Sequence, residues 1–381
     1  MLKAFKYRLY PNCAQTAKLN QTLDICRTLY NACLEQRRTG YRQHRKAISA
    51  TQQMAELPDL KQALPEVGEV YSQVLQDVLW RVDTAFGNFF RRVRSHQRKA
   101  GYPRFQSHNR YDSFTYPQFG FSIAQGRLGL SKIGNIKIKL HRPIEGTVKT
   151  CTLKRKVDEW YVIFACEVPD AEPSEPTSVV GIDVGIEWFL ATSDGAFIEN
   201  PRLLDHSLRK LRKLQRSLSR KKLGSKNRNK ARILVAKQNR TVRRQRLDFQ
   251  HKVARTLVNQ YDVIAVEDLN VMGLVKNHSL ARHIADAGWA GFANILEHKA
   301  AYAGGRVIRV NPAYTSQVCS GCGCIVRKEL SERWHACPDC GLSIHRDTNA
   351  ARNILKAAGT PPLGGNVAER IASVAQEAHV F

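Results

Sequence analysis

The sequence predicts an α+β protein of several domains, in which a small β-barrel carries an inserted helical domain and precedes an α/β domain. Three observations support this. Short alternating apolar segments separated by glycines occupy residues 113–168, apolar residues recur at helical spacing over 13–94, and strand-like segments alternate with helical ones after residue 178. At 381 residues the chain is long enough for two or three domains.

The first 112 residues read as one strand followed by helices. Residues 2–10 alternate like a strand that ends at Pro11, and Asn12 with Gln15 forms a capping box for the next helix. Its apolar positions are Leu19, Leu23, Cys26, Tyr30 and Cys33. After Pro65, apolar residues from Val67 to Val93 predict a second helix with one continuous buried stripe. We expect residues 13–112 to form a helical domain.

The next segment, residues 113–168, has the pattern expected of short strands. "FGFSI", "RLGLS", "IKIKL", "VKTCTLKR" and "WYVIFACEV" are short runs divided by glycines, which is typical of a small barrel. The N-terminal strand would complete this barrel, so its predicted extent is residues 1–12 and 113–170. The acidic, proline-rich segment 169–178 reads as a linker.

The second half predicts an α/β domain. "VVGIDVGIEWFLATSDGAFIEN" reads as three strands with a turn at Gly185 and a hairpin at Asp194-Gly195. "YDVIAVEDLN" and "GRVIRVNP" are further strands, and a helix begins at Asp347. We expect this domain to cover 178–315 and 344–358, with a loosely held tail over 359–381.

The charge of the chain indicates a polyanionic partner. Lys and Arg number 60 against 33 Asp and Glu, for a net charge of +27. Residues 202–246 hold 18 Lys and Arg against one acid, Asp205, and leucines at helical spacing make this run a pair of basic helices. No 18-residue apolar run predicts a membrane span, and the N-terminus lacks a secretion signal, so we expect a cytoplasmic protein without a membrane partner.

Four cysteines form a metal-binding pattern. Cys319-x2-Cys322 and Cys337-x2-Cys340 are separated by 14 residues and carry glycines at each turn. Four thiolates complete a tetrahedral shell around one Zn²⁺ and leave no position for water, so the ion would be structural. Cys324, His335 and His345 are rival ligands that fit the paired spacing less well, and reduced structural thiols are the alternative to a metal.

Three acids stand at the ends of predicted elements. Asp183 and Glu267 end apolar strands, and Asp347 opens a helix. Each alone has an ordinary explanation, namely a turn cap, an ion pair or a helix cap. Together, carboxylates from two adjacent strands and a packed helix would repel one another without cations, and two Mg²⁺ ions would satisfy them and activate a water at a phosphodiester. Asp268 and Glu187 are weaker candidates.

These motifs carry a family resemblance. "GIDVG", "VEDLN", "CSGCG…CPDCG" and "HRDTNAARNIL", with "FKYRLYPNCAQ" and "GYPRF", resemble TnpB of bacterial insertion sequences over nearly the whole chain. The resemblance implies an RNA-guided DNA endonuclease with a wedge-like barrel resembling an OB-fold, a helical recognition domain and a RuvC nuclease of RNase H-like fold. A four-cysteine zinc ribbon, at 316–343 here, would interrupt the nuclease. It implies Asp183, Glu267 and Asp347 as catalytic acids. "IHRD" replaces the common "HDRD", which leaves the aspartate in place.

The resemblance also implies partners. A guide RNA from the transposon end would pair with double-stranded target DNA, in a monomer with one RNA associated with the bacterial nucleoid. The protein would read a short motif beside the target, near Met54, Ser72 and above all Gln76, whose amide suits adenine. The basic helices would hold the heteroduplex through its backbone. Their candidate contacts are Arg209, Lys213, Arg220, Lys221 and Arg243.

Three other functions use similar residues. A transposase would join strands with the same acid triad, and transposition without guide RNA would favour it. A DNA-binding repressor descended from such nucleases would have lost an acid, whereas all three are present. A junction resolvase needs far fewer residues than this chain has.

Overall fold

The computed structural model describes residues 1–96, 99–171, 176–329 and 331–359. It contains two compact units, Met1–Pro169 and Asp170–Phe381, which are described separately below. The tail predicted from residue 359 falls almost wholly outside the described residues. Across the described ranges, every helix is too short or too polar to span a bilayer.

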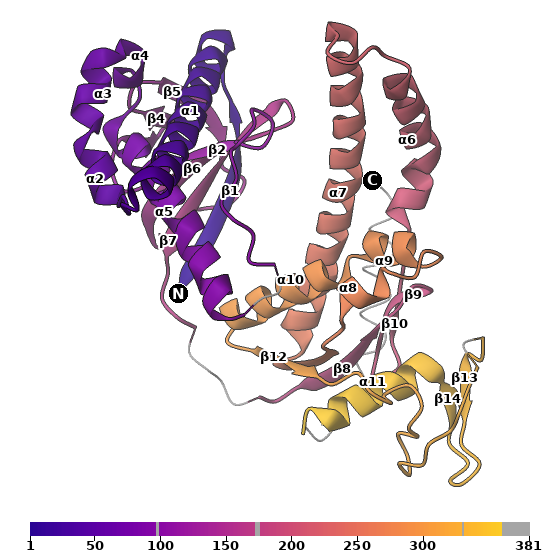
Figure 1. Cartoon of the computed structure of the whole chain (residues 1–381). Helices are drawn as coiled ribbons and strands as arrows, with labels where there is room; N and C mark the ends of the chain where they lie inside the picture. Colours follow the sequence, from indigo (N-terminus) through magenta and orange to yellow (C-terminus); the bar gives the residue numbers. More distant parts are fainter. Residues whose placement is uncertain (97–98, 172–175, 330, 360–381) are drawn as a thin grey trace. The chain divides into compact units, whose positions relative to one another are not determined.

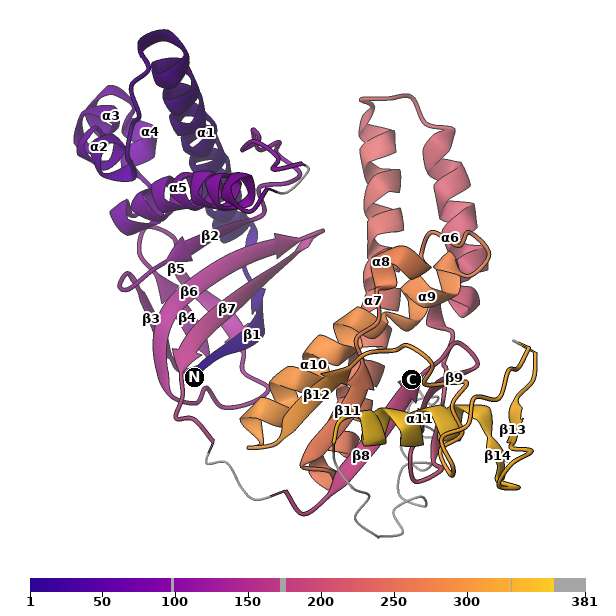
Figure 2. The same ribbon diagram turned by 60° about the horizontal axis from the view of Figure 1, so that its bottom comes forward.

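The first unit is built on a curled seven-stranded antiparallel sheet (Figure 2). Its order is β2-β6-β7-β1-β5-β4-β3, so β2 and β3 form the edges and the N-terminal strand lies in the middle. The strands are β1 (Leu2–Tyr10), β2 (Ser113–Tyr116), β3 (Phe121–Ala124), β4 (Arg127–Leu130), β5 (Gly134–Lys139), β6 (Thr147–Lys156) and β7 (Glu159–Glu167). Alternate side chains of β1 face the core, as Phe5, Tyr7 and Leu9 are all buried. The predicted barrel strands are therefore present as one curled sheet.

Five helices join β1 to β2, and α1 and α5 pack on this sheet, with the three short helices beside them (Figure 2). They are α1 (Cys13–His44), α2 (Ala50–Ala55), α3 (Leu57–Ala63), α4 (Pro65–Gly68) and α5 (Ser72–Arg94). Asn12 and Gln15 form the predicted capping box of α1. The prediction of a single helix after Pro65 was wrong. The backbone is extended at Tyr71, just before α5. There the Tyr71 ring stacks on the Tyr116 ring, with ring centroids 5.6 Å apart.

The buried stripe of α5 is shorter than predicted. Val74, Val78 and Val82 are completely buried, whereas Val93 is 46% exposed. The reason is that the helix runs past the sheet that covers its first turns, so its last two turns have no core to face.

The second unit has a mixed five-stranded sheet of order β10-β9-β8-β11-β12. The strands are β8 (Val179–Val184), β9 (Trp188–Thr192), β10 (Phe197–Glu199), β11 (Val263–Glu267) and β12 (Arg306–Val310). β8, β11 and β12 are parallel neighbours, and β9 and β10 extend the sheet antiparallel as a meander. This arrangement confirms the predicted α/β fold, because the three-strand run and both later strands occur where the sequence placed them.

Helices cover both faces of this sheet (Figure 1). The helices of this unit are α6 (Leu203–Ser219), α7 (Lys226–Gln260), α8 (Val271–Leu274), α9 (Ala281–Ala287), α10 (Trp289–Tyr302) and α11 (Arg346–Ala357), of which α7, α10 and α11 form this cover. α7 and α10 pack on the face that bears Ile182 and Ile264, and α11 packs on the face that bears Val179 and Ala265. α11 therefore approaches the sheet from the side opposite to the two longer helices.

The basic run forms a helical hairpin, α6 and α7, as predicted (Figure 1). Ser225 caps α7 by accepting from the backbone N–H of Arg228 at 3.1 Å. The cysteine-rich segment before α11 contains the short hairpin β13 (Trp334–Ala336) and β14 (Ser343–His345).

Candidate active site and metal centre

Two of the predicted acids lie at the same level on neighbouring parallel strands. Val266 of β11 pairs with Ile182 of β8, so Glu267 and Asp183 are the next residues along their strands. Both side chains are half-buried. Parallel register therefore brings the two carboxyls to one end of the sheet.

The third acid reaches this end from α11. Asp347 lies in the first turn, where the helix dipole favours an anion, and the ring of His345 caps the helix by accepting from the Asp347 N–H at 3.2 Å. α11 packs on β8, β9 and β11. The helix that carries Asp347 thus contacts both strands that carry the other acids.

A glycine allows this close packing. A Cβ added at Gly181 of β8 would lie 2.1 Å from the carbonyl oxygen of Ala351 and 2.9 Å from the Cβ of Leu355. The N–H of Gly181 donates to the Ser193 hydroxyl and its carbonyl accepts from the Ser193 N–H, while the Ser193 carbonyl accepts from Arg352 of α11 at 3.1 Å. Gly181 is therefore a contact point between α11 and the sheet, two residues before Asp183.

The three carboxyls influence one another electrostatically. Burial, followed by the negative charges of Glu267 and Asp347, raises the pKa of Asp183 well above its usual range, although Arg346 opposes this. Burial also raises the pKa of Glu267, opposed by its hydrogen bond from Thr315. The carboxyl oxygens of the three acids do not all lie within 4.8 Å of one another. Among the described residues, the groups of three or more possible metal ligands that lie this close all contain cysteines. The three carboxyls therefore form a cluster of like charges that disfavours ionisation of all of them.

The neighbouring acids are engaged elsewhere. Asp268 is 65% exposed and accepts from Arg309 at 3.2 Å, and Glu187 pairs with Arg333 at 2.8 Å. Both acids are therefore engaged in ion pairs with arginines, which agrees with their place as weaker candidates.

Sequence reasoning missed the residues that orient Glu267. The Thr315 hydroxyl donates to Glu267 Oε1 at 2.5 Å, and the Thr315 carbonyl accepts from Asn353 of α11 at 2.8 Å. Asn353 and Asn349 are buried on α11 among alanines and isoleucine. The signal in the sequence was a pair of asparagines four residues apart on the apolar face of "DTNAARNIL". Buried amides require hydrogen-bond partners, so this pair indicates contacts with another segment.

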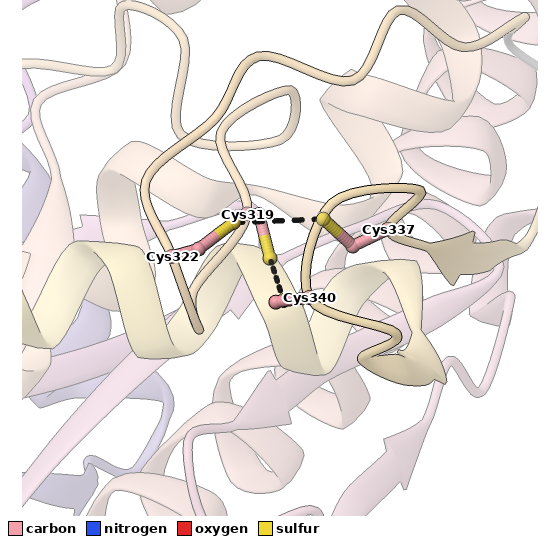
Figure 3. A group of neighbouring side chains, drawn as sticks. All are labelled: Cys319, Cys322, Cys337 and Cys340. Atoms are coloured by element: carbon pink, nitrogen blue, oxygen red, sulfur yellow. Dashed lines mark hydrogen bonds between the residues drawn. The ribbon is translucent and has the colours of Figure 1, made fainter.

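The four predicted zinc cysteines come together (Figure 3). Their sulfurs all lie within 4.8 Å of one another, with Cys319 Sγ 3.6 Å from Cys340 Sγ and Cys322 Sγ 3.6 Å from Cys337 Sγ. Each of these short distances joins a cysteine of the first CxxC turn to one of the second. All four sulfurs can therefore surround one ion in a tetrahedral shell. Hydrogen bonding from the Cys340 N–H lowers the pKa of Cys337 to about 6, which favours the metal-binding thiolate.

A fifth thiol lies beside this cluster. Cys324 Sγ is 3.2 Å from Cys337 Sγ, and Cys324 also groups with Cys322 and Asp339. The spacing of the cysteines in the sequence ranked Cys324 below the four paired ones. Its short distance from Cys337 makes it a rival ligand, which a variant at this position can test.

The cysteine module is tied directly to α11. Asn349 accepts from the Ser320 N–H at 2.8 Å and donates to the Val318 carbonyl at 2.7 Å, and Lys356 donates to the Ser320 carbonyl. The first knuckle is therefore hydrogen-bonded to the helix that carries Asp347.

Comparisons with known proteins identify relatives over the same regions. The OrfB family of IS605, described as "Probable transposase", matches residues 163–278, and a Cas12f1-like TNB domain matches 289–354. A Streptomyces pristinaespiralis protein, whose assigned name is that of an RNA-guided DNA endonuclease, is 36% identical over 93% of this chain and 89% of its own length. InsQ of Escherichia coli K12, named in the same way, is 30% identical over 93% and 92%.

The chain belongs to the TnpB (OrfB, IS605) family.

A solved structure agrees with this TnpB fold. A Cas12f1 in complex with single guide RNA and target DNA superposes with a TM-score of 0.55 at 16% identity, covering 91% of this chain and 83% of that one. A family model described as a helix-turn-helix domain matches residues 1–46, but this segment is one strand followed by a single 32-residue helix. The description therefore does not fit the TnpB structure in this region.

The predicted motif-reading residues of this TnpB lie in three environments. Gln76 is exposed on α5, between the buried Val74 and Val78. Ser72 is exposed at the start of α5 and accepts from the Lys61 ammonium at 2.6 Å. Met54 of α2 is partly buried against the core, so its side chain contributes packing as well as surface.

The predicted basic contacts are all exposed. Four of them line a hollow of about 1310 Å³ along α6 and the turn that follows it. They are Arg209, Lys213, Arg220 and Lys221. Arg243 is exposed on α7, outside that hollow. Exposed cations along one helix can neutralise a phosphate backbone without reading its sequence.

We expect Gly181→Ala to destabilise this TnpB, because its methyl group would collide with the Ala351 carbonyl. Overpacking of this kind costs about 1–3 kcal/mol. That loss should lower the melting temperature by about 2–4 °C per kcal/mol.

Gly291→Ala on α10 is the matched control, because a Cβ there meets nothing within 4 Å. Removing a helical glycine should stabilise by about 0.5–1 kcal/mol. Equal melting temperatures for the two variants would contradict the role of Gly181. Differential scanning fluorimetry measures both.

Proposed function

We infer that this chain is an RNA-guided DNA endonuclease with a RuvC-like nuclease site. The observation that carries this inference is the convergence of Asp183, Glu267 and Asp347 at one end of the mixed sheet. It occurs in a chain 36% identical over almost its full length to a relative bearing that name. A family member with an intact acid cluster is equipped for phosphodiester hydrolysis.

We propose that the acid cluster holds Mg²⁺. The donor set consists of carboxylate oxygens, which hard divalent cations prefer, and the raised pKa of Asp183 indicates negative charge that a cation would compensate. Asp183, Glu267 and Asp347 would be the ligands. Two bound Mg²⁺ ions would supply an activated water and stabilise the leaving oxygen of the phosphodiester. Thr315 would orient Glu267, and α11 would hold Asp347 in place.

We propose that the cysteine cluster binds one structural Zn²⁺ through Cys319, Cys322, Cys337 and Cys340. Their sulfurs are mutually close, and soft thiolates select zinc over Mg²⁺. The bound ion would hold the ribbon against α11, since this segment is too short to form a hydrophobic core of its own.

The domain limits follow from this proposal. Residues 1–12 and 113–170 would be the wedge, 13–112 the recognition domain, 178–315 with 344–358 the nuclease, and 316–343 the ribbon. The chain would act as a monomer with one transposon-derived guide RNA on double-stranded DNA beside a short motif, in the bacterial nucleoid. The exposed cations of α6 and α7 support a backbone-binding role.

Guided cleavage tests the proposal. The full chain, expressed beside its native transposon end, would be purified with its RNA, and that RNA sequenced. Plasmids carrying the matching target next to a randomised motif should be cut in Mg²⁺, and plasmids with a scrambled target should remain intact. Equal cutting of both plasmids, or none in either, would refute guided cleavage.

The description "Probable transposase" keeps strand transfer as the second candidate. The same acids serve both reactions, so the products must decide. Joined donor and target strands in a reaction without guide RNA would favour a transposase, whereas free 5′ and 3′ ends at the guided position favour the endonuclease.

We expect Asp183→Asn to change stability in a pH-dependent way in magnesium-free buffer. The raised pKa means that the folded chain retains a proton that the unfolded chain loses. The stability due to the protonated carboxyl is complete below the unfolded pKa, about 3.9, and is lost as pH rises through the folded pKa. Asparagine carries no charge, so the variant should melt increasingly above the wild type as pH rises from about 4 through the folded pKa.

Mg²⁺ at pH 8.5 should raise the melting temperature of the wild type and leave Asp183→Asn unchanged. Asp248→Asn, an exposed acid on α7, serves as control and should follow the wild type at every pH. If the melting temperatures of Asp183→Asn and the wild type differ by a constant amount across this range, the carboxyls do not repel one another enough to affect stability.

We expect Gln76→Ala to relax one position of the adjacent motif. The side chain is exposed on α5, and a lost bidentate contact to adenine costs about 1–3 kcal/mol of discrimination. A motif-library cleavage screen measures it, with Gln43→Ala, an exposed glutamine on α1, as control. An unchanged motif and rate for Gln76→Ala would remove Gln76 as a reader.

A further inference from the structure

A groove in the first unit is used by none of the sites described above. It has a volume of about 610 Å³ and lies between the last turns of α1 and α5 and the segment that follows α5. Five rings line it, and they define the aromatic groove: Tyr41, Phe86, Phe89, Phe90 and Tyr102. Tyr102 belongs to the "GYPRF" motif, which the proposed nuclease chemistry leaves without a role.

The rings of the groove support one another but leave large faces exposed. Tyr102 meets Phe86 edge-on at 5.6 Å and Phe89 at 5.2 Å, so its ring is held in place. Tyr41 is 57% exposed, Phe90 50% and Tyr102 45%. A folded domain rarely exposes so many apolar faces together unless they bind something.

A buried arginine at the groove has a donor without a partner. Arg37 is only 8% exposed, and it donates to Gln53 at 2.9 Å and to Asp83 at 3.0 Å. Its Nη2 is buried and, among the described residues, has no hydrogen-bond partner. Since Arg37 lines the groove, an acceptor atom of a ligand there would satisfy this costly orphan donor.

Further arginines surround the groove. The Arg45 guanidinium lies 5.6 Å from the centre of the Tyr41 ring, and Arg38 lies 5.1 Å from the centre of Phe105, the last residue of "GYPRF". Arg92 donates to the Gly101 carbonyl at 3.2 Å beside Tyr102. Exposed rings interleaved with guanidinium groups match the stacking and phosphate contacts that single-stranded nucleic acids require.

We propose that the aromatic groove binds unpaired bases of a single-stranded RNA segment. Ring faces would stack on the bases, Arg37 Nη2 would donate to a base acceptor, and the surrounding arginines would contact phosphates. The half-exposed Asp83 carboxylate and the tyrosine hydroxyls supply partners for a ribose 2′-OH, which selects RNA over DNA. A second copy of the chain is disfavoured, because it would bring another arginine-rich rim of a +27 protein against the first.

Photocrosslinking of the full-length protein tests this assignment, which deepens the proposed function by placing part of the bound RNA. The probe is a 20-nucleotide single-stranded RNA containing 5-iodouracil, irradiated with the protein and mapped by peptide mass spectrometry. Crosslinks should fall on peptides containing Tyr41, Phe90 or Tyr102. They should disappear at the groove in Phe90→Ala and Tyr102→Leu but persist in Tyr10→Leu, an exposed ring flanked by Arg8 outside the groove.

Affinities for base-bearing and abasic RNA of equal length separate stacking from charge. Phe90→Ala should weaken binding of the base-bearing strand by about 5- to 150-fold and leave the abasic strand unchanged, since stacking contributes about 1–3 kcal/mol per base. Equal losses on both strands, or groove crosslinks to the matching DNA as strong as to RNA, would overturn the proposal. So would self-association in sedimentation that Phe90→Ala abolishes.

These outcomes are independent of guided cleavage. Groove crosslinks in a protein that fails to cut would sink the endonuclease and leave the groove assignment standing. Guided cutting with no crosslink at the groove would do the reverse.

Discussion

Asp183→Asn is expected to abolish guided DNA cleavage while RNA and target binding persist. The substitution keeps the size of the side chain but removes a carboxylate that faces Glu267 and Asp347 at the end of the sheet. Metal ions stabilise transition-state charge by several kcal/mol, so the rate should fall at least about 10³-fold. A plasmid cleavage assay and a filter-binding assay on the same preparation measure the two effects.

Asp268→Asn is the matched control. It lies one residue beyond Glu267, is 65% exposed and pairs with Arg309, so cleavage should be close to that of the wild type. Retained cleavage in purified Asp183→Asn would remove Asp183 from the catalytic set. Loss of binding together with cleavage would instead point to a folding defect, which the melting curves of the same variant detect.

Cys337→Ser is expected to lose zinc and then lose cleavage. Cys337 is buried, and its sulfur lies 3.6 Å from that of Cys322, so serine at this position removes a thiolate from inside the cluster. Zinc should fall from about one ion per chain to nearly none, because a closed four-sulfur site couples binding to folding. Elemental analysis of the purified protein measures the stoichiometry.

The route from zinc to cleavage is the contact between the first knuckle and α11. Ser320 and Val318 are hydrogen-bonded to Asn349, and loss of the knuckle would release the helix that carries Asp347. Cys13→Ser, an exposed thiol at the start of α1, should keep both zinc and activity.

Cys324→Ser decides whether the fifth thiol is a ligand. It should retain one zinc if the paired spacing identifies the ligands. Zinc loss in Cys324→Ser, with retention in Cys322→Ser or Cys340→Ser, would reassign the shell.

Local pattern was sufficient for most elements of the fold. Alternation marked β1 and the later strands, and leucine spacing marked α6, because these periods follow from backbone geometry and burial alone. The Asn12–Gln15 capping box was also predictable, since its hydrogen bonds span only three residues. The expected continuous helix after Pro65 was wrong because Tyr71 leaves the helix to stack on Tyr116, a partner 45 residues away in the chain.

The acids and cysteines could be named from the sequence for different reasons. The cysteine spacing is a local rule of metal geometry, so the cluster was predictable without the fold. The acids were predictable only as a set at element ends, supported by family resemblance, since nothing local requires Asp183 and Glu267 to be neighbours. Parallel pairing of β8 with β11 puts them side by side.

The sequence by itself determined the composition of the protein: its basic helices, its strands, its four paired cysteines and the three acids. Only the tertiary structure decided that Gly181 lets α11 reach β8, that Thr315 and Asn353 orient Glu267, and that rings from α1, α5 and "GYPRF" form one groove. The physical reason is the separation along the chain over which each effect acts. Periodicity and metal spacing act over a few residues, whereas close approach, hydrogen-bond partners and shared grooves depend on which distant segments the packed core brings into contact.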